Sequence, residues 1–124
     1  MAIETIFEER TVTGRSYLRI GIINGKVVIE SFMFSEEPDE DYCKVTIDKQ
    51  TFISSVVKTF IQTGNGKGEY CDLSSNFKVT VAIQRISKDI WFSIYVVVSE
   101  FRSVGFSWII KDREEFIKAL EKLL

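Results

Sequence analysis

The sequence predicts an α+β fold in which a unit of four strands and one helix (ββββα) occurs twice. Three observations support this fold class. Eight short segments are expected to be strands, several because apolar and polar residues alternate with the period of two that is typical of half-buried strands. The segments after Asp48 and after Asp112 change to the spacing of an amphipathic helix. Finally, residues 27–60 align without a gap over residues 91–124, at an offset of 64 residues.

The first half contains four predicted strands, which cover residues 3–12, 17–22, 26–34 and 42–47. Asn24-Gly25 separates the second strand from the third and is the strongest short-range signal for a hairpin turn. An acidic run at residues 36–41 separates the third strand from the fourth, and we interpret it as a solvated hairpin loop. Without its five acids, the net charge of the chain changes from −2 to +3.

The first helix is expected at about residues 48–62, with Asp48 as its N-cap and Phe52 on its buried face. Three glycines lie within residues 64–68. A phosphate-binding P-loop would follow a strand and end in Gly-Lys-Ser/Thr, and this segment does neither. We therefore interpret residues 64–68 as a helix C-cap and a flexible Gly-rich connector.

The second half follows the same order, with a helix at residues 112–124 whose N-cap is Asp112 and whose Glu115 completes a capping box. Its predicted strands cover residues 69–73, 78–83, 90–99 and 105–110. Six of the 34 aligned positions are identical, and they include both N-caps and the pair Phe52 and Phe116. We predict one domain over residues 1–124, in which tandem repeats 1–63 and 69–124 pack antiparallel sheets and two helices about a pseudo-twofold axis.

The composition excludes several classes of function. The chain has no histidine, which removes Ser-His-Asp and Cys-His catalysis and His-ligated zinc. Cys43 and Cys71 are too few for a tetrahedral zinc site, and we expect both to be reduced and half-buried. We therefore predict no enzymatic activity, no cofactor and no metal. With no long apolar run and no signal-like N-terminus, the chain is expected in the cytoplasm without a membrane partner.

Several short motifs suggest a superfamily. They are Tyr-Leu-Arg at residues 17–19, Asn-Gly-Lys-Val-Val-Ile at residues 24–29, and Val-Thr-Ile at residues 45–47 followed by Phe52. In these motifs and in its duplicated ββββα order, the chain resembles the single-stranded-nucleic-acid-binding superfamily of positive-cofactor-four-like transcriptional coactivators, Whirly proteins and PUR-repeat proteins. The resemblance implies a Whirly-like fold that binds single-stranded DNA or RNA, as in transcription or replication accessory factors. The chain departs from the coactivators in having acids where they have a basic stretch before the last strand.

Binding a single strand requires cations for the phosphates and aromatic faces on which bases stack. Strand parity places Trp91 and Tyr95 opposite the uniformly apolar face of their strand, and therefore outward. Phe32, Phe34 and Trp108 are expected in the core. We expect the outward cations and aromatics of both halves to form one continuous track. The candidate nucleic-acid-binding residues are Arg15, Tyr17, Arg19, Lys26, Lys78, Trp91 and Tyr95.

The composition also fits an alternative function. The acidic pI of about 5.2 also fits a non-catalytic protein-interaction or assembly domain of the same fold. In that case the outward Trp91 and Tyr95 would be buried against a protein partner or in a homo-oligomer.

Overall fold

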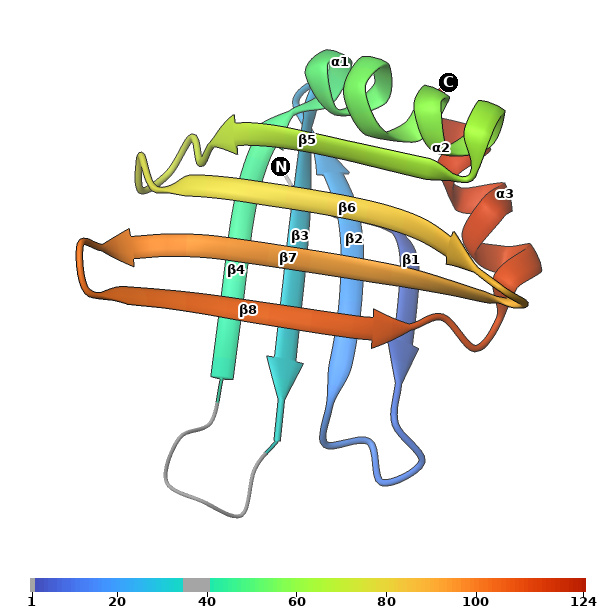
Figure 1. The fold of residues 1–124 in the computed structure, drawn as a ribbon, viewed down its shortest axis with the longest axis horizontal. Coiled ribbons are helices and arrows are strands. Elements are labelled where there is room, and N and C mark those ends of the chain that lie inside the picture. Colours follow the sequence, from blue (N-terminus) through green and yellow to red (C-terminus); the bar gives the residue numbers. More distant parts are fainter. Residues whose placement is uncertain (1, 35–40) are drawn as a thin grey trace.

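Figure 1 shows the computed structural model, which describes residues 2–34 and 41–124. Two four-stranded antiparallel sheets pack face to face, and the strands of one sheet run across those of the other. Two helical segments lie at one end of this sandwich. The predicted α+β class with antiparallel sheets and two helices is confirmed. Most of the acidic run, residues 36–40, lies outside the described residues.

The first sheet has the strand order β1-β2-β3-β4. Its strands are β1 (Glu4–Arg10), β2 (Tyr17–Ile23), β3 (Lys26–Met33) and β4 (Asp41–Asp48). The predicted Asn24-Gly25 hairpin is confirmed, because both residues have positive φ angles, 49° and 73°, and connect β2 to β3. Asparagine and glycine adopt this conformation at little cost, which explains why the turn forms here.

The second sheet has the order β5-β6-β7-β8. Its strands are β5 (Asn65–Cys71), β6 (Lys78–Ile86), β7 (Asp89–Ser99) and β8 (Arg102–Ile109). Gly64 caps the preceding helix at a φ of 82°, as predicted. The interpretation of residues 65–68 as a flexible connector is wrong, because they begin β5. A Cβ on Gly66 would collide with the carbonyl group of Val56, so this glycine allows the helix to lie directly on the strand.

The first helical segment consists of α1 (Lys49–Phe52), a π-helical turn η1 (Ile53–Val57) and α2 (Lys58–Thr63). The second is α3 (Arg113–Leu123). Both predicted N-caps are confirmed. Asp48 Oδ2 accepts a hydrogen bond from Thr51 N at 2.9 Å, and Asp112 Oδ1 accepts one from Glu115 N at 3.1 Å.

The helices join the two halves into a single core. The first helical segment packs on β5 and β6 of the second half, whereas α3 lies against β1 of the first half. The fully buried Phe116 on α3 lies at the centre of the core that the two halves share. Its ring meets Phe7 edge-on at 5.1 Å between centroids, Phe92 at 6.2 Å and Phe60 at 6.5 Å. Aromatic side chains of both halves are therefore buried around one ring.

A buried carboxylate on β1 fixes the start of α3. Glu9 points into the sandwich and is 9% exposed. Its Oε1 accepts hydrogen bonds from Trp108 Nε1 at 2.8 Å and from Lys111 N at 2.9 Å, and its Oε2 accepts one from Asp112 N at 2.9 Å. Trp108 is buried, as predicted. Glu9 thus connects the first strand of the chain to the end of β8 and to the helix that follows.

A second buried carboxylate, Asp72, lies just after β5. It connects the second half of the chain back to the first half. Asp72 is 3% exposed, and its Oδ1 accepts a hydrogen bond from Thr46 N of β4 at 2.8 Å. The next residue, Leu73, donates its backbone N–H to Thr46 O at 2.8 Å. The second half therefore satisfies backbone groups on the edge of the first sheet, where an unpaired strand would otherwise be exposed.

We predict that Glu9→Ala lowers the free energy of unfolding by about 3 kcal/mol, because it leaves the buried Trp108 indole N–H and two partly buried backbone N–H groups without this acceptor. The control is Glu8→Ala, since its neighbour Glu8 faces outward and pairs with Arg19. A surface pair of this kind contributes about 0–1 kcal/mol. Urea unfolding of the variants measures the difference. Equal losses for the two variants would contradict the structural role of Glu9.

We also predict that Phe52→Ala and Phe116→Ala each lower the free energy of unfolding by roughly 3–5 kcal/mol, because both side chains are fully buried. Phe101→Ala serves as the matched control, since Phe101 is 94% exposed and its truncation should change stability by less than about 0.5 kcal/mol. Thermal or denaturant unfolding tests all three. If Phe52→Ala and Phe116→Ala unfold at nearly the same midpoint as the wild type, these side chains do not anchor the core.

Candidate nucleic-acid interface

The candidate residues divide between the outer faces of the two sheets. Tyr17 and Arg19 lie on the outer face of the first sheet, and Lys78, Trp91 and Tyr95 lie on that of the second. The sheets pack through their inner faces, so the two outer faces point in opposite directions (Figure 1). The prediction of one continuous track across a single chain is therefore wrong. Parity was predicted correctly for β2 and β7, but parity alone does not show how two sheets stack.

Three aromatic side chains form a row across the outer face of the first sheet. Tyr17 on β2 lies opposite Phe32 on β3, and Phe32 lies opposite Tyr42 on β4. The rings of Tyr17 and Phe32 are stacked, with centroids 6.0 Å apart and planes inclined by 23°. Tyr42 is 51% exposed. We call Tyr17, Phe32 and Tyr42 the aromatic row.

Two arginines lie over aromatic rings at this end of the sheet. The guanidinium carbon of Arg10, directly opposite Tyr17 on β1, is 4.8 Å from the centroid of the Tyr17 ring. That of Arg15, in the loop between β1 and β2, is 4.8 Å from the Phe34 ring centroid. Both contacts have the geometry of cation–π interactions. The exposed Arg10 and Arg15 therefore bring positive charge to the aromatic row.

The prediction that Phe32 and Phe34 are core residues is wrong. Phe32 belongs to the outer face, and Phe34 follows β3 and is 37% exposed. The inner positions of β3 are taken by Val27, Ile29 and Ser31, which are buried. The strand is apolar on both faces for much of its length, so its pattern did not indicate which side faces the core.

A row of charged residues runs parallel to the aromatic row. Glu8, Arg19, Glu30 and Lys44 lie opposite one another across the four strands. Arg19 Nη2 is 2.6 Å from Glu8 Oε1, and its Nη1 is 2.9 Å from Glu30 Oε1. The hydrogen bond from Arg19 holds the pKa of Glu8 below its usual value. The charge of Arg19 is thus already matched by two carboxylates, and Arg19 holds the side chains of Glu8 and Glu30 in place.

The charged row also orients Tyr42. The Tyr42 hydroxyl donates a hydrogen bond to Glu30 Oε2 at 2.5 Å. Partial burial and this acceptor raise the pKa of Tyr42, so the phenol stays protonated at neutral pH. The exposed ring is thereby held at one end of the aromatic row.

The remaining candidates lie elsewhere. Lys26 pairs with Ile23 and Asp48 at the other end of the first sheet, away from the aromatic row. On the second sheet, Tyr95 is 49% exposed and donates its hydroxyl to Ser103 Oγ at 2.7 Å. Trp91 is half-buried four residues before Tyr95 on β7. Lys78 is exposed at the start of β6.

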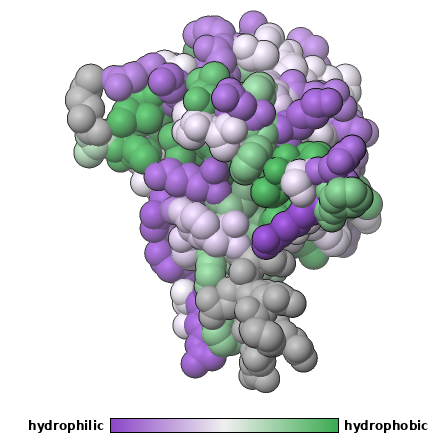
Figure 2. Space-filling model, turned by 90° about the vertical axis from the view of Figure 1, so that its left-hand side faces the viewer, coloured by the Kyte–Doolittle hydropathy of each residue, from purple (hydrophilic) through white to green (hydrophobic). Residues whose placement is uncertain are grey.

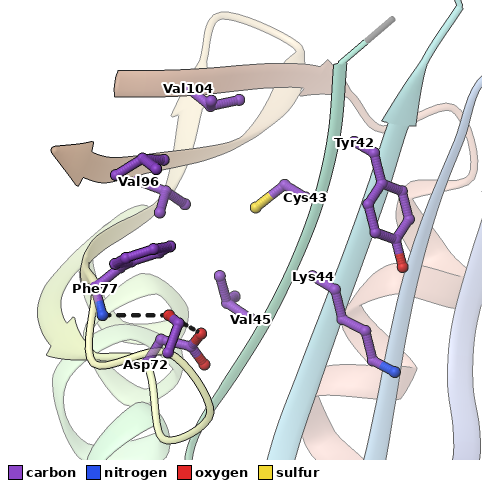
Figure 3. A pocket seen from close by; sticks show the side chains of 10 residues that line it. Tyr42, Cys43, Lys44, Val45, Asp72, Phe77, Val96 and Val104 are labelled. Atoms are coloured by element: carbon purple, nitrogen blue, oxygen red, sulfur yellow. Dashed lines mark hydrogen bonds between the residues drawn. The ribbon is translucent and has the colours of Figure 1, made fainter. Parts of the chain in front are cut away.

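A pocket of about 260 Å³ opens between the two sheets (Figure 3). Cys43, Val45 and Val96 are among its apolar walls, and the buried Asp72 lies at its polar end. Figure 2 views this side of the molecule, where apolar surface appears between hydrophilic patches. Burial raises the pKa of the Cys43 thiol to about 11. Within the described residues, no three Cys, Asp or Glu side chains gather in a way that could hold a metal ion.

No helix in the described part of the chain is long and apolar enough to cross a membrane. No family model, curated protein or solved structure significantly matches this chain. The function of the site is therefore inferred from its own residues and their geometry.

Sequence reasoning missed Arg10, Phe32, Phe34 and Tyr42. A signal for Phe32 was present, because the two-residue Asn24-Gly25 turn fixes the register of β2 against β3 and places Tyr17 opposite Phe32. The pairing of Tyr42 with Phe32 depends on the longer connection through residues 35–40, whose length does not fix a register.

We predict different reactivities for the two free cysteines. At pH 8, a maleimide should label the exposed Cys71 rapidly and Cys43 slowly, because the thiolate is the reactive form and Cys43 is both buried and of raised pKa. Labelling of Cys43 should accelerate as the pH approaches 11 or when the chain unfolds. Mass spectrometry of peptides from a time course measures both rates, and Cys71→Ser isolates the slow one. Equal rates at pH 8 would contradict the burial of Cys43.

Proposed function

We propose that the chain is a non-catalytic module that binds single-stranded DNA or RNA across the outer face of the first sheet. The observation that supports this function is the aromatic row, which lies in register across three neighbouring strands next to Arg10 and Arg15. Aromatic faces stack bases of any sequence, and adjacent cations contact the phosphates between them.

The site favours a single strand over a duplex. A row of rings on a flat sheet stacks with bases only when the bases are splayed out, and bases in a duplex are already stacked on one another. Tyr42 is the ring of the row most open to a base, since Tyr17 is stacked on Phe32 and has Arg10 and Arg19 over its ring.

The cations around the aromatic row would contact the phosphates. Arg15 keeps its guanidinium N–H groups for phosphate oxygens while its plane rests on the Phe34 ring, and Lys44 is exposed beyond Glu30. Arg10 has long bonds of 3.4 Å to Glu8 Oε1 and to Gly14 O, which a phosphate oxygen can replace. Arg19 is a positioning residue, since its guanidinium already bridges Glu8 and Glu30. The two carboxylates limit the electrostatic part of the affinity, so base stacking supplies a large share of it.

We also propose that the two halves are copies of one ββββα unit, related by a pseudo-twofold axis. Support comes from the identical order of elements, from Asp48 and Asp112 as N-caps, and from Phe52 and Phe116 as the buried aromatics that follow them. This organisation agrees with the resemblance to the coactivator, Whirly and PUR-repeat superfamily, which implies the same class of ligand.

Fluorescence anisotropy with labelled single-stranded DNA and RNA, and with a duplex of the same sequence, tests the proposal. Single strands should bind more tightly than the duplex. Tyr42→Ala should weaken binding by roughly 1–3 kcal/mol, the usual value of one stacked base. With three cations engaged, log affinity should fall against log salt with a slope of about −2, and Arg15→Ala should make this slope shallower by about 0.7.

Tyr95→Ala is the matched control, because Tyr95 is as exposed as Tyr42 but lies on the opposite face. It should leave the affinity unchanged, and binding should not quench Trp91, which shares the face of Tyr95. The proposal fails if no oligonucleotide binds at low salt. It also fails if Tyr95→Ala costs as much as Tyr42→Ala, since that result would place the strand on the second sheet.

A further inference from the structure

We infer that the outer face of the second sheet is a self-association surface whose partner is a second copy of this chain. This surface lies opposite the proposed nucleic-acid interface and does not depend on it. Three properties support the inference, namely the distribution of charge on the face, its shape and its area.

The centre of this face carries no charged side chain, whereas its rim does. Its central residues are small, polar or aromatic: Thr80, Ala82, Gln84, Trp91, Ser93, Tyr95, Gly105 and Ser107. The charged residues lie around them: Lys67 and Glu69 on the outermost strand β5, Lys78 at the start of β6 and Asp89 at the start of β7. A centre depleted of charge, with tyrosine and tryptophan inside a polar rim, is typical of protein–protein interfaces.

The two outer faces differ in the ligand that each can take. The first sheet presents the alternating charges of Glu8, Arg19, Glu30 and Lys44 beside its aromatic row. The centre of the second sheet has no cation that could bind a phosphate. Because its side chains are uncharged, the free-energy cost of removing their water against another sheet is small. Two copies can also meet here without placing like charges against each other at the centre.

The face has a ridge beside hollows, which is the relief that a contact between two copies needs. Tyr95 forms a ridge between two hollows, one of about 590 Å³ beside Thr80 and Val97 and one of about 210 Å³ beside Ala82 and Ser93. The ring has room because Gly105 lies next to it, where a Cβ would be 3.4 Å from Tyr95 Cδ2. The bond from the hydroxyl to Ser103 Oγ fixes the ring. Under a twofold axis, the ridge of each copy can enter a hollow of the other, as an isologous interface requires.

The area of the face fits a weak dimer. Four strands at about 4.8 Å spacing and about eight residues at 3.3 Å each give a footprint of about 500 Å² per copy. The total of about 1,000 Å² is at the lower limit for a specific interface. We therefore expect a reversible monomer–dimer equilibrium.

Sedimentation velocity from about 1 µM to about 1 mM, a range in which weak dimers dissociate, tests the inference. A reducing agent in the buffer prevents disulfides through the exposed Cys71. The wild-type sedimentation coefficient should rise with concentration towards that of a dimer. Ala82→Arg and Ser93→Arg place a charge in the centre of the face, and each should weaken association at least about tenfold, since an unpaired charge is costly to bury.

Ile61→Arg is the matched control, because it introduces the same side chain at an exposed apolar position on α2. It should leave association unchanged, and unfolding midpoints of all three variants should confirm that they fold. The inference is overturned if the wild type is monomeric throughout, if both central variants still dimerise, or if Ile61→Arg weakens the dimer equally. It is also overturned if the central arginines alter oligonucleotide binding and not association.

Discussion

The arrangement of the whole molecule depends on the buried carboxylate of Glu9. Its three hydrogen bonds connect β1 to the Trp108 indole and to the two backbone amides that lead into α3. Because these amides precede the first turn of the helix, Glu9 sets where α3 begins and directs Phe116 into the core between both halves. Burying a carboxylate is costly unless it is fully hydrogen-bonded, so the packing around Glu9 allows little variation in geometry.

Both inner faces form this shared core, so neither is available to a ligand. The two outer faces have separate chemistry. One combines stacked aromatics with arginines and a row of ion pairs, while the other has a neutral centre of small side chains. The proposed nucleic-acid interface and the proposed self-association surface lie on opposite faces, so occupation of one would not block the other.

Local features of the fold could be predicted from the sequence because they depend on short-range chemistry. Alternation identified the strands, and a single aspartate marked the start of each helix. The start of β5 was missed because glycines in a sequence suggest a flexible segment. In the structure Gly66 is needed for a different reason, since the backbone of Val56 lies too close to leave room for a side chain. The continuous track was wrong because strand parity contains no information on the stacking of sheets. Phe32 was misplaced because β3 is apolar on both sides, and Tyr42 could not be paired without the register across residues 35–40.

The contact between Phe7 and Phe116 has a consequence for how the chain reaches its folded state. The two rings are in contact although they lie near opposite ends of the sequence. While a ribosome is still synthesising the chain, the first sheet and its helix therefore exist without the ring around which they pack. Nascent chains of this kind expose apolar strands for longer than chains dominated by local contacts. We expect productive folding only after the segment that contains residue 116 has emerged, so slow translation of the second half would prolong the period in which the first half can aggregate.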